Sequence, residues 1–360
     1  MFTLYGALAA LSLAALLAVA FVVLKKRDAD YGAFIRLAVL CVPFAFLGSR
    51  IAFCLSNLSY YLETISMPEM MLHVWDGGAS MTGAMVGVIL AAFAAAKWCK
   101  LPAGTMLDAI AFGAPAALVI ERLAEPLCEM GWGRDFQSTV FNFMYDLTEG
   151  MHPVFVYEAI AAVIIGVAMA VYFRNHKVMQ GDALGFFLVL YGCTQTVLES
   201  LRNDGHMKVI HFVRINQVAA IAMTTVVLIL WSIRCVKNGG RKESILSWLT
   251  TVVCIGFGVV QEFAVDGDEN PYFSYTLVAG VLAVLLVISC AAWFLQWKKQ
   301  GKSALAVPAV ALLAAVLVLI ERTVDTGDHR LFFVYGVMAA NLYIIGHMAF
   351  ALRRRAAIKE

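Results

Sequence analysis

Apolar runs of about 20 residues recur along the whole chain, and they limit the folds that it can adopt. A helix needs about 20 apolar residues to cross the hydrocarbon core of a bilayer, and a helix satisfies its backbone hydrogen bonds internally. The sequence therefore predicts an all-α polytopic membrane protein. The expected spans, about eleven by this length criterion, are residues 5–24, 34–56, 79–96, 104–124, 153–173, 183–201, 211–233, 245–264, 272–296, 304–321 and 331–352.

Composition agrees with a membrane protein and argues against several other classes. The chain is 62% hydrophobic and 14% charged, whereas a soluble domain is about 45–50% apolar and about 25% charged. A net charge of +2 gives no reason to expect a nucleic-acid partner. The eight cysteines are scattered without metal-ligand spacing, so we expect no metal site, no disulfide framework and no cofactor.

Basic residues fall in every second predicted loop, while acidic residues occupy the others. Loops rich in lysine and arginine face the cytoplasm. The first basic cluster follows the first apolar run, which is the wrong order for a cleavable signal peptide. We therefore predict a multi-pass protein with its N-terminus outside and its C-terminus in the cytoplasm. The basic clusters are residues 25–27, Lys97 with Lys100, Arg174 with Lys177, residues 234–242, residues 298–302 and residues 353–355.

The last third of the chain contains an internal repeat. Residues 261–280 resemble residues 320–340, and such self-similarity indicates duplicated structural units. We predict a duplicated helical hairpin there, which gives about four additional spans after a seven-span core. The basic loop 237–244 separates the two parts, so the expected domains are residues 1–236 and 237–360.

Polar and ionisable residues within or beside the predicted spans gather at one depth, near the outer leaflet. Charged side chains are costly inside a bilayer, so they mark candidate functional sites. The residues at this depth are Arg50, Asp76, Glu121, Arg122, Glu125, Glu158, Gln195, Glu199 and Arg202. By their spacing, four side chains in and just after span 183–201 share one helical face, namely Tyr191, Gln195, Glu199 and Arg202.

Two interpretations of this cluster stay open. The arginines can pair with the glutamates and hold the helices in register. Alternatively, the cluster forms a site, and the guanidinium fork of arginine then suits a lipid phosphate. The segment HVWDGGASMTGAMVGV (73–88) favours a site, because Gly77 and Gly78 can bring backbone N–H groups close to a headgroup. Gly83 and Gly87 fit a small-residue pattern for tight helix packing instead.

Several short segments match one protein family in order and at corresponding topological positions. They are LYG at 4–6, LGSRIAF at 47–53, YYLE at 60–63, VWDGGASMTGAMVG at 74–87, residues 108–115 leading to Arg122, WGR at 132–134, HPVFVYEA at 152–159, YGCTQTVLESLR at 191–202 and NQVAAIAM at 216–223. Through these segments the chain resembles the prolipoprotein diacylglyceryl transferases. The resemblance covers roughly residues 4–235 and implies an enzyme of the bacterial inner membrane with a seven-span core.

The resemblance implies a reaction between phosphatidylglycerol and the lipobox cysteine of a prolipoprotein signal peptide. The thiol attacks the diacylglyceryl carbon, a thioether forms and glycerol phosphate leaves, so both substrates and the surrounding membrane lipids are expected partners. The residues then expected to act in catalysis are Arg122, Glu158, Tyr191, Glu199 and Arg202. Those expected to bind substrate are Arg50, Asp76, Gly77, Gly78, Thr82, Arg134 and Gln195. Arg122 is the first candidate for the phosphate.

The chain departs from the family pattern at four positions. Thr82 stands where the family has a histidine, and Gln195 replaces an arginine; Glu125 and Cys128 occupy two asparagine positions. Threonine cannot serve as the base that histidine provides. A glutamate could replace it if burial raised the pKa of its carboxyl; the three candidates are Glu121, Glu125 and Glu158.

The loop 131–153 is rich in aromatic residues. This loop is either an interfacial lid for the signal peptide or an aromatic belt segment, and His152 within it is expected to be structural or interfacial.

Three functions are compatible with the sequence. The leading one is the transferase, on prolipoproteins or on another acceptor. The second is a lipid-binding protein that has lost catalysis, for which Thr82 and Gln195 argue. A lipid transporter comes last, because transporters usually have inverted repeats and a midplane site.

Overall fold

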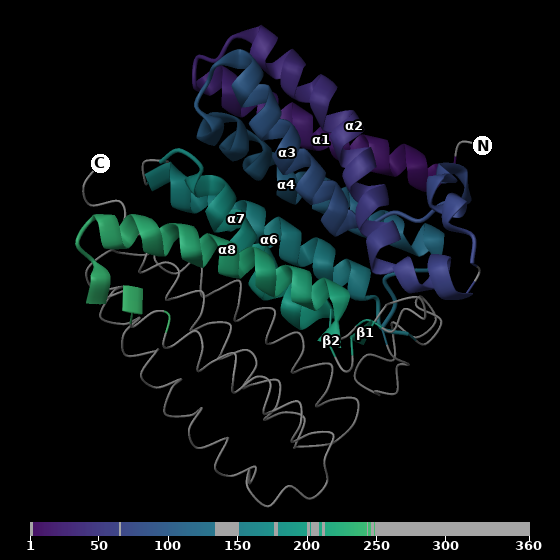
Figure 1. The fold of residues 1–360 in the computed structure, drawn as a ribbon. Helices are drawn as coiled ribbons and strands as arrows, with labels where there is room; N and C mark the ends of the chain where they lie inside the picture. Colours follow the sequence, from purple (N-terminus) through teal and green to yellow (C-terminus); the bar gives the residue numbers. More distant parts are fainter. Residues whose placement is uncertain are drawn as a thin grey trace, which may run out of the picture.

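Helices dominate the part of the chain that the computed structural model describes. This part comprises residues 3–64, 66–133, 151–175, 179–199, 202, 209–210, 213–242, 244–245 and 248. Its α-helices are α1 (Leu4–Lys26), α2 (Tyr31–Ser56), α3 (Met81–Cys99), α4 (Ala103–Ala124), α6 (Val154–Asn175), α7 (Asp182–Leu198) and α8 (Ile215–Lys237) (Figure 1). Shorter elements are η1 (Tyr60–Thr64), η2 (Pro68–Leu72), η3 (Val74–Asp76), η4 (Glu125–Cys128) and the antiparallel pair β1 (Val209–Ile210) and β2 (Val213–Arg214).

The helices confirm the predicted fold class of an all-α polytopic membrane protein. Six of the described helices are long and apolar enough to cross a membrane: α1, α2, α3, α4 continued through η4, α6 and α8. The seventh, α7, has 17 residues and is buried along almost its whole length, so it lies at the centre of the bundle. The predicted additional spans, from residue 245 onward, and their duplicated hairpin lie almost wholly outside the described residues.

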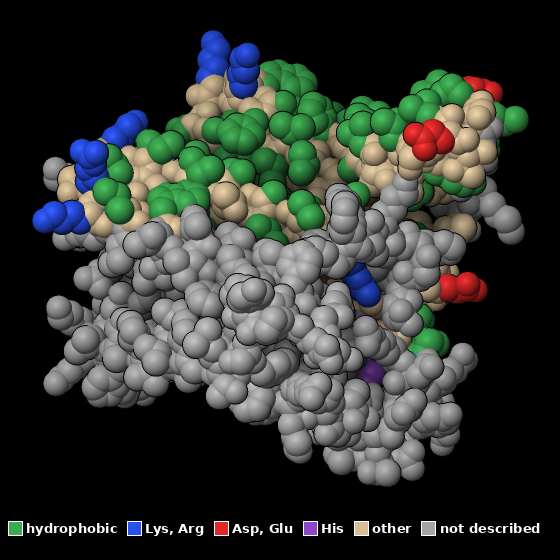
Figure 2. Space-filling view, turned by 60° about the horizontal axis from the view of Figure 1, so that its bottom comes forward, with side chains coloured by type: hydrophobic (Ala, Val, Ile, Leu, Met, Phe, Trp, Pro, Cys, Tyr) green, Lys and Arg blue, Asp and Glu red, His purple; other side chains and the backbone are tan. Residues whose placement is uncertain are grey.

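The two ends of the bundle differ in charge. At one end, on the right in Figure 1, α2, α4 and α7 end and α3, α6 and α8 begin; we call it the site end. The opposite end carries the basic residues of four last helical turns, which are Lys25 and Lys26, Lys97, Arg174, and Arg234 with Lys237. Figure 2 shows most of the visible basic side chains toward one end, acidic ones toward the other, and apolar side chains between them.

Two apolar cores join through α4. One core combines α1, α2, α3 and the first half of α4, and the other combines the second half of α4 with α6, α7 and α8. Helix α4 packs against α1, α3, α6 and α7, while α7 also packs against α8. Arg122 near the end of α4 is therefore held beside α6 and α7, the two helices whose residues it meets at the site end.

At the opposite end of the bundle, the carboxylate of Asp108 joins α4 to the start of α7. Asp108 is fully buried, and its Oδ1 accepts a hydrogen bond from the Ala183 backbone N–H at 2.9 Å. Its Oδ2 accepts from the Gly181 N–H at 3.2 Å and from Arg27 Nη1 at 3.0 Å. A carboxylate at a helix N-terminus satisfies unpaired amide groups and complements the helix dipole. These bonds fix the position of α7 along the axis of α4, and with it the relative position of the site residues on the two helices.

Helices α2 and α3 cross with their backbones almost in contact. A Cβ on Gly83 would lie 2.3 Å from the Gly48 carbonyl oxygen, and a Cβ on Gly87 would lie 2.0 Å from the Phe44 carbonyl oxygen. Both distances are far shorter than van der Waals contact. The small-residue interpretation of Gly83 and Gly87 is therefore the one that the structure supports.

Replacing Gly87 by alanine should destabilise the protein by about 1–3 kcal/mol, the usual cost of overpacking a close contact. The added methyl group meets the Phe44 carbonyl, which cannot move without shifting α2. Thermal unfolding in detergent, followed by circular dichroism, measures the change. Val86→Ile is the matched control, because Val86 is exposed on the same helix. An unfolding midpoint unchanged in Gly87→Ala would contradict the close crossing.

Candidate functional site

Arg122 is the centre of a buried polar network at the site end. It lies in the last turn of α4 and is 5% exposed. Its Nη1 donates to Glu125 Oε1, its Nη2 donates to the Tyr191 hydroxyl at 3.1 Å, and its Nε lies 3.3 Å from Glu158 Oε2. A guanidinium has five N–H donors. Among the described residues two of these donors have no hydrogen-bond partner, so Arg122 keeps capacity for a further acceptor.

Arg202 closes the network from the other side. It follows α7, is 2% exposed, and pairs through its backbone with Gly133. Its Nη1 lies 2.9 Å from Glu158 Oε2, and its Nη2 lies 2.9 Å from Glu125 Oε2. Glu125 and Glu158 are thus each shared by two arginines. Buried ion pairs of this kind hold only when both partners stay hydrogen-bonded, because an isolated buried charge is strongly destabilising.

Gln195, which was expected to bind substrate, donates hydrogen bonds to two glutamates. Its Nε2 donates to Glu158 Oε1 at 2.7 Å and to Glu199 Oε2 at 2.9 Å. The other oxygen of Glu199 accepts from Asn216 Nδ2 at 3.0 Å. Both N–H donors of the Gln195 amide are therefore used. This neutral side chain joins α6 to α7 and, through Glu199, to α8.

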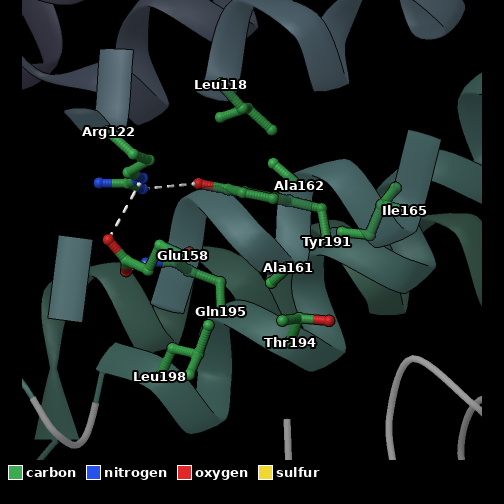
Figure 3. A pocket seen from close by; sticks show the side chains of 10 residues that line it. All are labelled: Leu118, Arg122, Glu158, Ala161, Ala162, Ile165, Tyr191, Thr194, Gln195 and Leu198. Carbon is green, nitrogen blue, oxygen red and sulfur yellow. Dashed lines mark hydrogen bonds and ion pairs between the residues drawn. The ribbon is translucent and has the colours of Figure 1, made fainter. Parts of the chain in front are cut away.

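A small cavity lies directly beside Arg122, between α4, α6 and α7. Figure 3 shows the guanidinium of Arg122 directed at the Tyr191 hydroxyl and the Glu158 carboxylate, all three on the cavity wall. The rest of the wall is mostly apolar. Its further lining residues are Leu118, Ala161, Ala162, Ile165, Thr194, Gln195 and Leu198. The cavity measures about 10 Å³, room for roughly one water molecule. A phospholipid could therefore enter only if the surrounding helices separate, and the arginine at one end with an apolar remainder matches a phosphate and a hydrocarbon chain in chemistry, not in size.

Arg50 makes a different set of contacts from those expected for a residue that binds phosphate. Its Nε donates to the Met71 carbonyl at 3.1 Å, and its Nη2 donates to the carbonyls of Met70 and His73 at 3.1 and 2.9 Å. Its Nη1 donates to the carbonyls of Gly77 and Gly78. All five donors are used within the loop between α2 and α3. Arg50 consequently holds this loop and has no donor left for a headgroup.

The glycine pair receives this arginine through its backbone conformation. Gly77 and Gly78 have φ values of +82° and +84°, a region that residues with a Cβ rarely adopt. The expectation for Gly77 and Gly78 was a close approach of their N–H groups to a lipid. In the structure their carbonyls contact Arg50, and a Cβ on Gly78 would also overlap the Phe53 ring.

The remaining predicted residues are placed as follows. Thr82 is half-buried in the first turn of α3. His152 is buried, not interfacial, and its Nδ1 lies 3.4 Å from the Tyr157 hydroxyl. Gly133 donates to the His152 carbonyl at 2.8 Å, so both ends of the aromatic loop meet. Arg134, the loop 134–150 and the side chain of Asp76 lie outside the described residues.

Sequence reasoning missed the support that α8 gives to the site. Arg214 donates to the backbone carbonyl of Glu199, and Gln217 donates to the Thr196 carbonyl at 3.1 Å while capping α8 through the Arg214 N–H. Asn216 completes this set through its bond to Glu199. The signal was present in the matching segment NQVAAIAM, but without a fold its polar residues had no visible partners.

A model of the prolipoprotein diacylglyceryl transferase family matches residues 1–233, which include the whole network. The chain belongs to this family. The predictions of the family and of a membrane-bound transferase enzyme are confirmed.

Curated relatives of known name agree with this family, at low identity. The phosphatidylglycerol–prolipoprotein diacylglyceryl transferase of Clostridium novyi (strain NT) is 23% identical over 257 residues, covering 67% of this chain and 93% of that protein. The enzyme of the same name from Symbiobacterium thermophilum is 26% identical over 234 residues, covering 61% and 85%. That of Thermotoga maritima is 25% identical over 233 residues, covering 59% and 73%.

Proposed function

We propose that the protein transfers the diacylglyceryl group of phosphatidylglycerol to the lipobox cysteine thiol of prolipoproteins. The observation that carries this proposal is Arg122, a buried arginine with two uncommitted donors on the wall of a largely apolar cavity. When glycerol phosphate leaves, negative charge develops on the phosphate oxygen. A guanidinium in a site shielded from water stabilises that charge strongly. Family membership and the names of the relatives support the same reaction.

Each neighbour of Arg122 has a role in this proposal. Tyr191 accepts from Arg122, so its own O–H is directed away and can donate to a second phosphate oxygen. Glu125, Glu158 and Arg202 keep the arginine fixed, and Gln195 with Glu199 ties this arrangement to α7 and α8. Electrostatic stabilisation depends on such preorganisation, because the groups need not reorient during the reaction.

We also propose the orientation and the membrane. The basic last turns of α1, α3, α6 and α8 lie at the opposite end of the bundle, which by the positive-inside rule faces the cytoplasm. The site end then faces outward at the bacterial inner membrane, where a prolipoprotein with its signal peptide in the bilayer presents its cysteine. The N-terminus lies outside in this orientation.

A second candidate function is lipid binding without catalysis. The observation in its favour is the charge balance of the network. Gln195 adds no positive charge, and the carboxylates of Glu125 and Glu158 each bind both buried arginines. Such a protein would hold phosphatidylglycerol but leave a thiol unmodified.

One experiment separates the two functions. The purified protein is incubated with labelled phosphatidylglycerol and a lipobox peptide, and the peptide is followed by mass spectrometry, with a peptide that has serine in place of cysteine as the control. We expect a diacylglyceryl adduct on the cysteine peptide only. Phosphatidylglycerol bound to the protein without any adduct would support the binding protein and contradict the transferase.

A further inference from the structure

We propose that Glu121 is the catalytic base, which removes the proton of the attacking thiol in place of the histidine that Thr82 replaces. This inference rests on the proposed function, because it names the base for that same reaction. A thiol has a reference pKa of about 8.5 and reacts as the thiolate, so the site needs a group that accepts a proton. The candidates are the buried carboxylates at the site end, and their contacts distinguish them.

Both oxygens of Glu158 are engaged in the network. Its Oε1 accepts the amide of Gln195 at 2.7 Å, and its Oε2 lies 2.9 Å from Arg202 Nη1 and 3.3 Å from Arg122 Nε. Three of the roughly four lone-pair sites of this carboxylate thus face the Gln195 amide or an arginine, and two guanidinium groups pair with its charge. Protonation of Glu158 would remove the charge that pairs with both Arg122 and Arg202.

Glu125 and Glu199 also have partners on both sides, arginines for Glu125 and neutral amides for Glu199. Glu125 Oε1 accepts from Arg122 and, at 3.3 Å, from Arg202, whose Nη2 also lies 2.9 Å from Glu125 Oε2. Glu199 accepts from Gln195 on one oxygen and from Asn216 on the other. Glu125 Oε2 has no hydrogen bond of its own, but it forms an ion pair with Arg202. Both carboxylates therefore hold the network together through their contacts.

Glu121 differs from these three. It precedes Arg122 in the last turn of α4, and its side chain is 15% exposed. Its Oε2 is buried without a hydrogen-bond partner and lies 3.9 Å from Arg122 Nε. No hydrogen bond joins its carboxylate to any residue in the part of the chain that the structure describes. An uncommitted lone pair beside the phosphate-binding arginine is what a general base at this site requires.

The surroundings of Glu121 are suited to a proton that arrives from a substrate. The Glu121 side chain is 15% exposed, and η4, which follows it, ends at the exposed Cys128, so this side of Arg122 reaches the surface at the site end. The charged groups that act on Glu121 are Arg122, Arg202, Glu125 and Glu158. Two of these groups are positive and two are negative, and none of them forms a hydrogen bond with the Glu121 carboxylate in the part of the chain that the structure describes.

The proposed step balances in atoms and electrons. The thiol proton moves to the Glu121 carboxylate, and the sulfur forms a bond to the diacylglyceryl carbon. The bond between that carbon and the phosphate oxygen breaks, and its electron pair leaves with glycerol phosphate beside Arg122. Glu121 then returns its proton to water or to the departing phosphate.

The test compares two peptides on one variant. In Glu121→Gln we expect transfer to a lipobox cysteine to fall by about 10²–10⁴-fold, the usual contribution of a general base, while binding of phosphatidylglycerol, measured by native mass spectrometry, stays unchanged. A peptide with selenocysteine in place of cysteine should lose far less activity, because a selenol ionises without help. Glu129→Gln, an exposed glutamate four residues beyond Glu125, is the matched control.

Each outcome distinguishes the inference from the proposed function. Equal losses for the cysteine and selenocysteine peptides would show a structural role for Glu121 and overturn the inference. Undiminished transfer in Glu121→Gln would overturn it as well, while leaving the transferase function intact. An inactive wild-type protein, tested with the same peptides, overturns the proposed function and with it the base.

Discussion

Arg122→Lys should lower the rate of diacylglyceryl transfer by about 10²–10³-fold, the cost of losing one preorganised donor at a developing negative charge. A lysine ammonium has three donors at one point and lacks the planar fork of arginine. It cannot bind Glu125, Glu158 and Tyr191 together and still reach a phosphate. Initial rates with the cysteine peptide, at saturating phosphatidylglycerol, measure this loss.

The alanine variant answers a different question. Among the described residues, Arg122→Ala leaves Arg202 as the one arginine paired with Glu125 and Glu158, and breaking a buried ion pair costs about 3–5 kcal/mol of stability. A lost activity in that variant would therefore mix catalysis with unfolding. Arg174→Lys, at the exposed opposite end of α6, is the control for the lysine variant. Wild-type rates in a folded Arg122→Lys protein would contradict the role of Arg122.

The spans could be predicted from sequence because hydropathy and length decide them. The expected span 104–124 agrees with α4 to within one residue, and the expected span 34–56 lies within α2. The sequence also predicted that the ionisable residues lie near each other, because their positions along the predicted spans put them all at the same end of the helices. Arg122, Tyr191 and Arg202 indeed meet there.

The partners within that set could not be predicted, because they depend on helix rotation and on backbone geometry. Glu125 lies next to both arginines only because α4 continues into the 3₁₀ turn η4, which turns this residue inward. Arg50 has the same residue type and depth as Arg122, yet it binds carbonyls of a loop. A sequence gives no measure of where carbonyl groups of an irregular loop point.

The second large effect is expected at Arg50, as a residue that positions the loop between α2 and α3. Five carbonyls of residues 70–78 converge on one guanidinium, and a lysine can satisfy at most three of them. In Arg50→Lys the segment 70–78 should lose its fixed conformation, and with it the fixed entry to α3, where Thr82 lies. We expect amide hydrogen exchange in this segment to rise by about tenfold or more, because net hydrogen bonds to charged groups contribute about 1.5–3 kcal/mol each.

Transfer should fall in Arg50→Lys through a weaker fit of the substrates, because Arg50 itself has no donor free for them. The Michaelis constant for the lipobox peptide should therefore rise more than the turnover number falls, whereas Arg122→Lys should mainly lower the turnover number. Arg36→Lys, on the same helix α2 but at the opposite end beside Trp98, should change neither the exchange of residues 70–78 nor the kinetics. If hydrogen exchange of residues 70–78 stayed unchanged in Arg50→Lys while the turnover number fell strongly, Arg50 would act on the phosphate itself. That result would contradict its role in holding the loop.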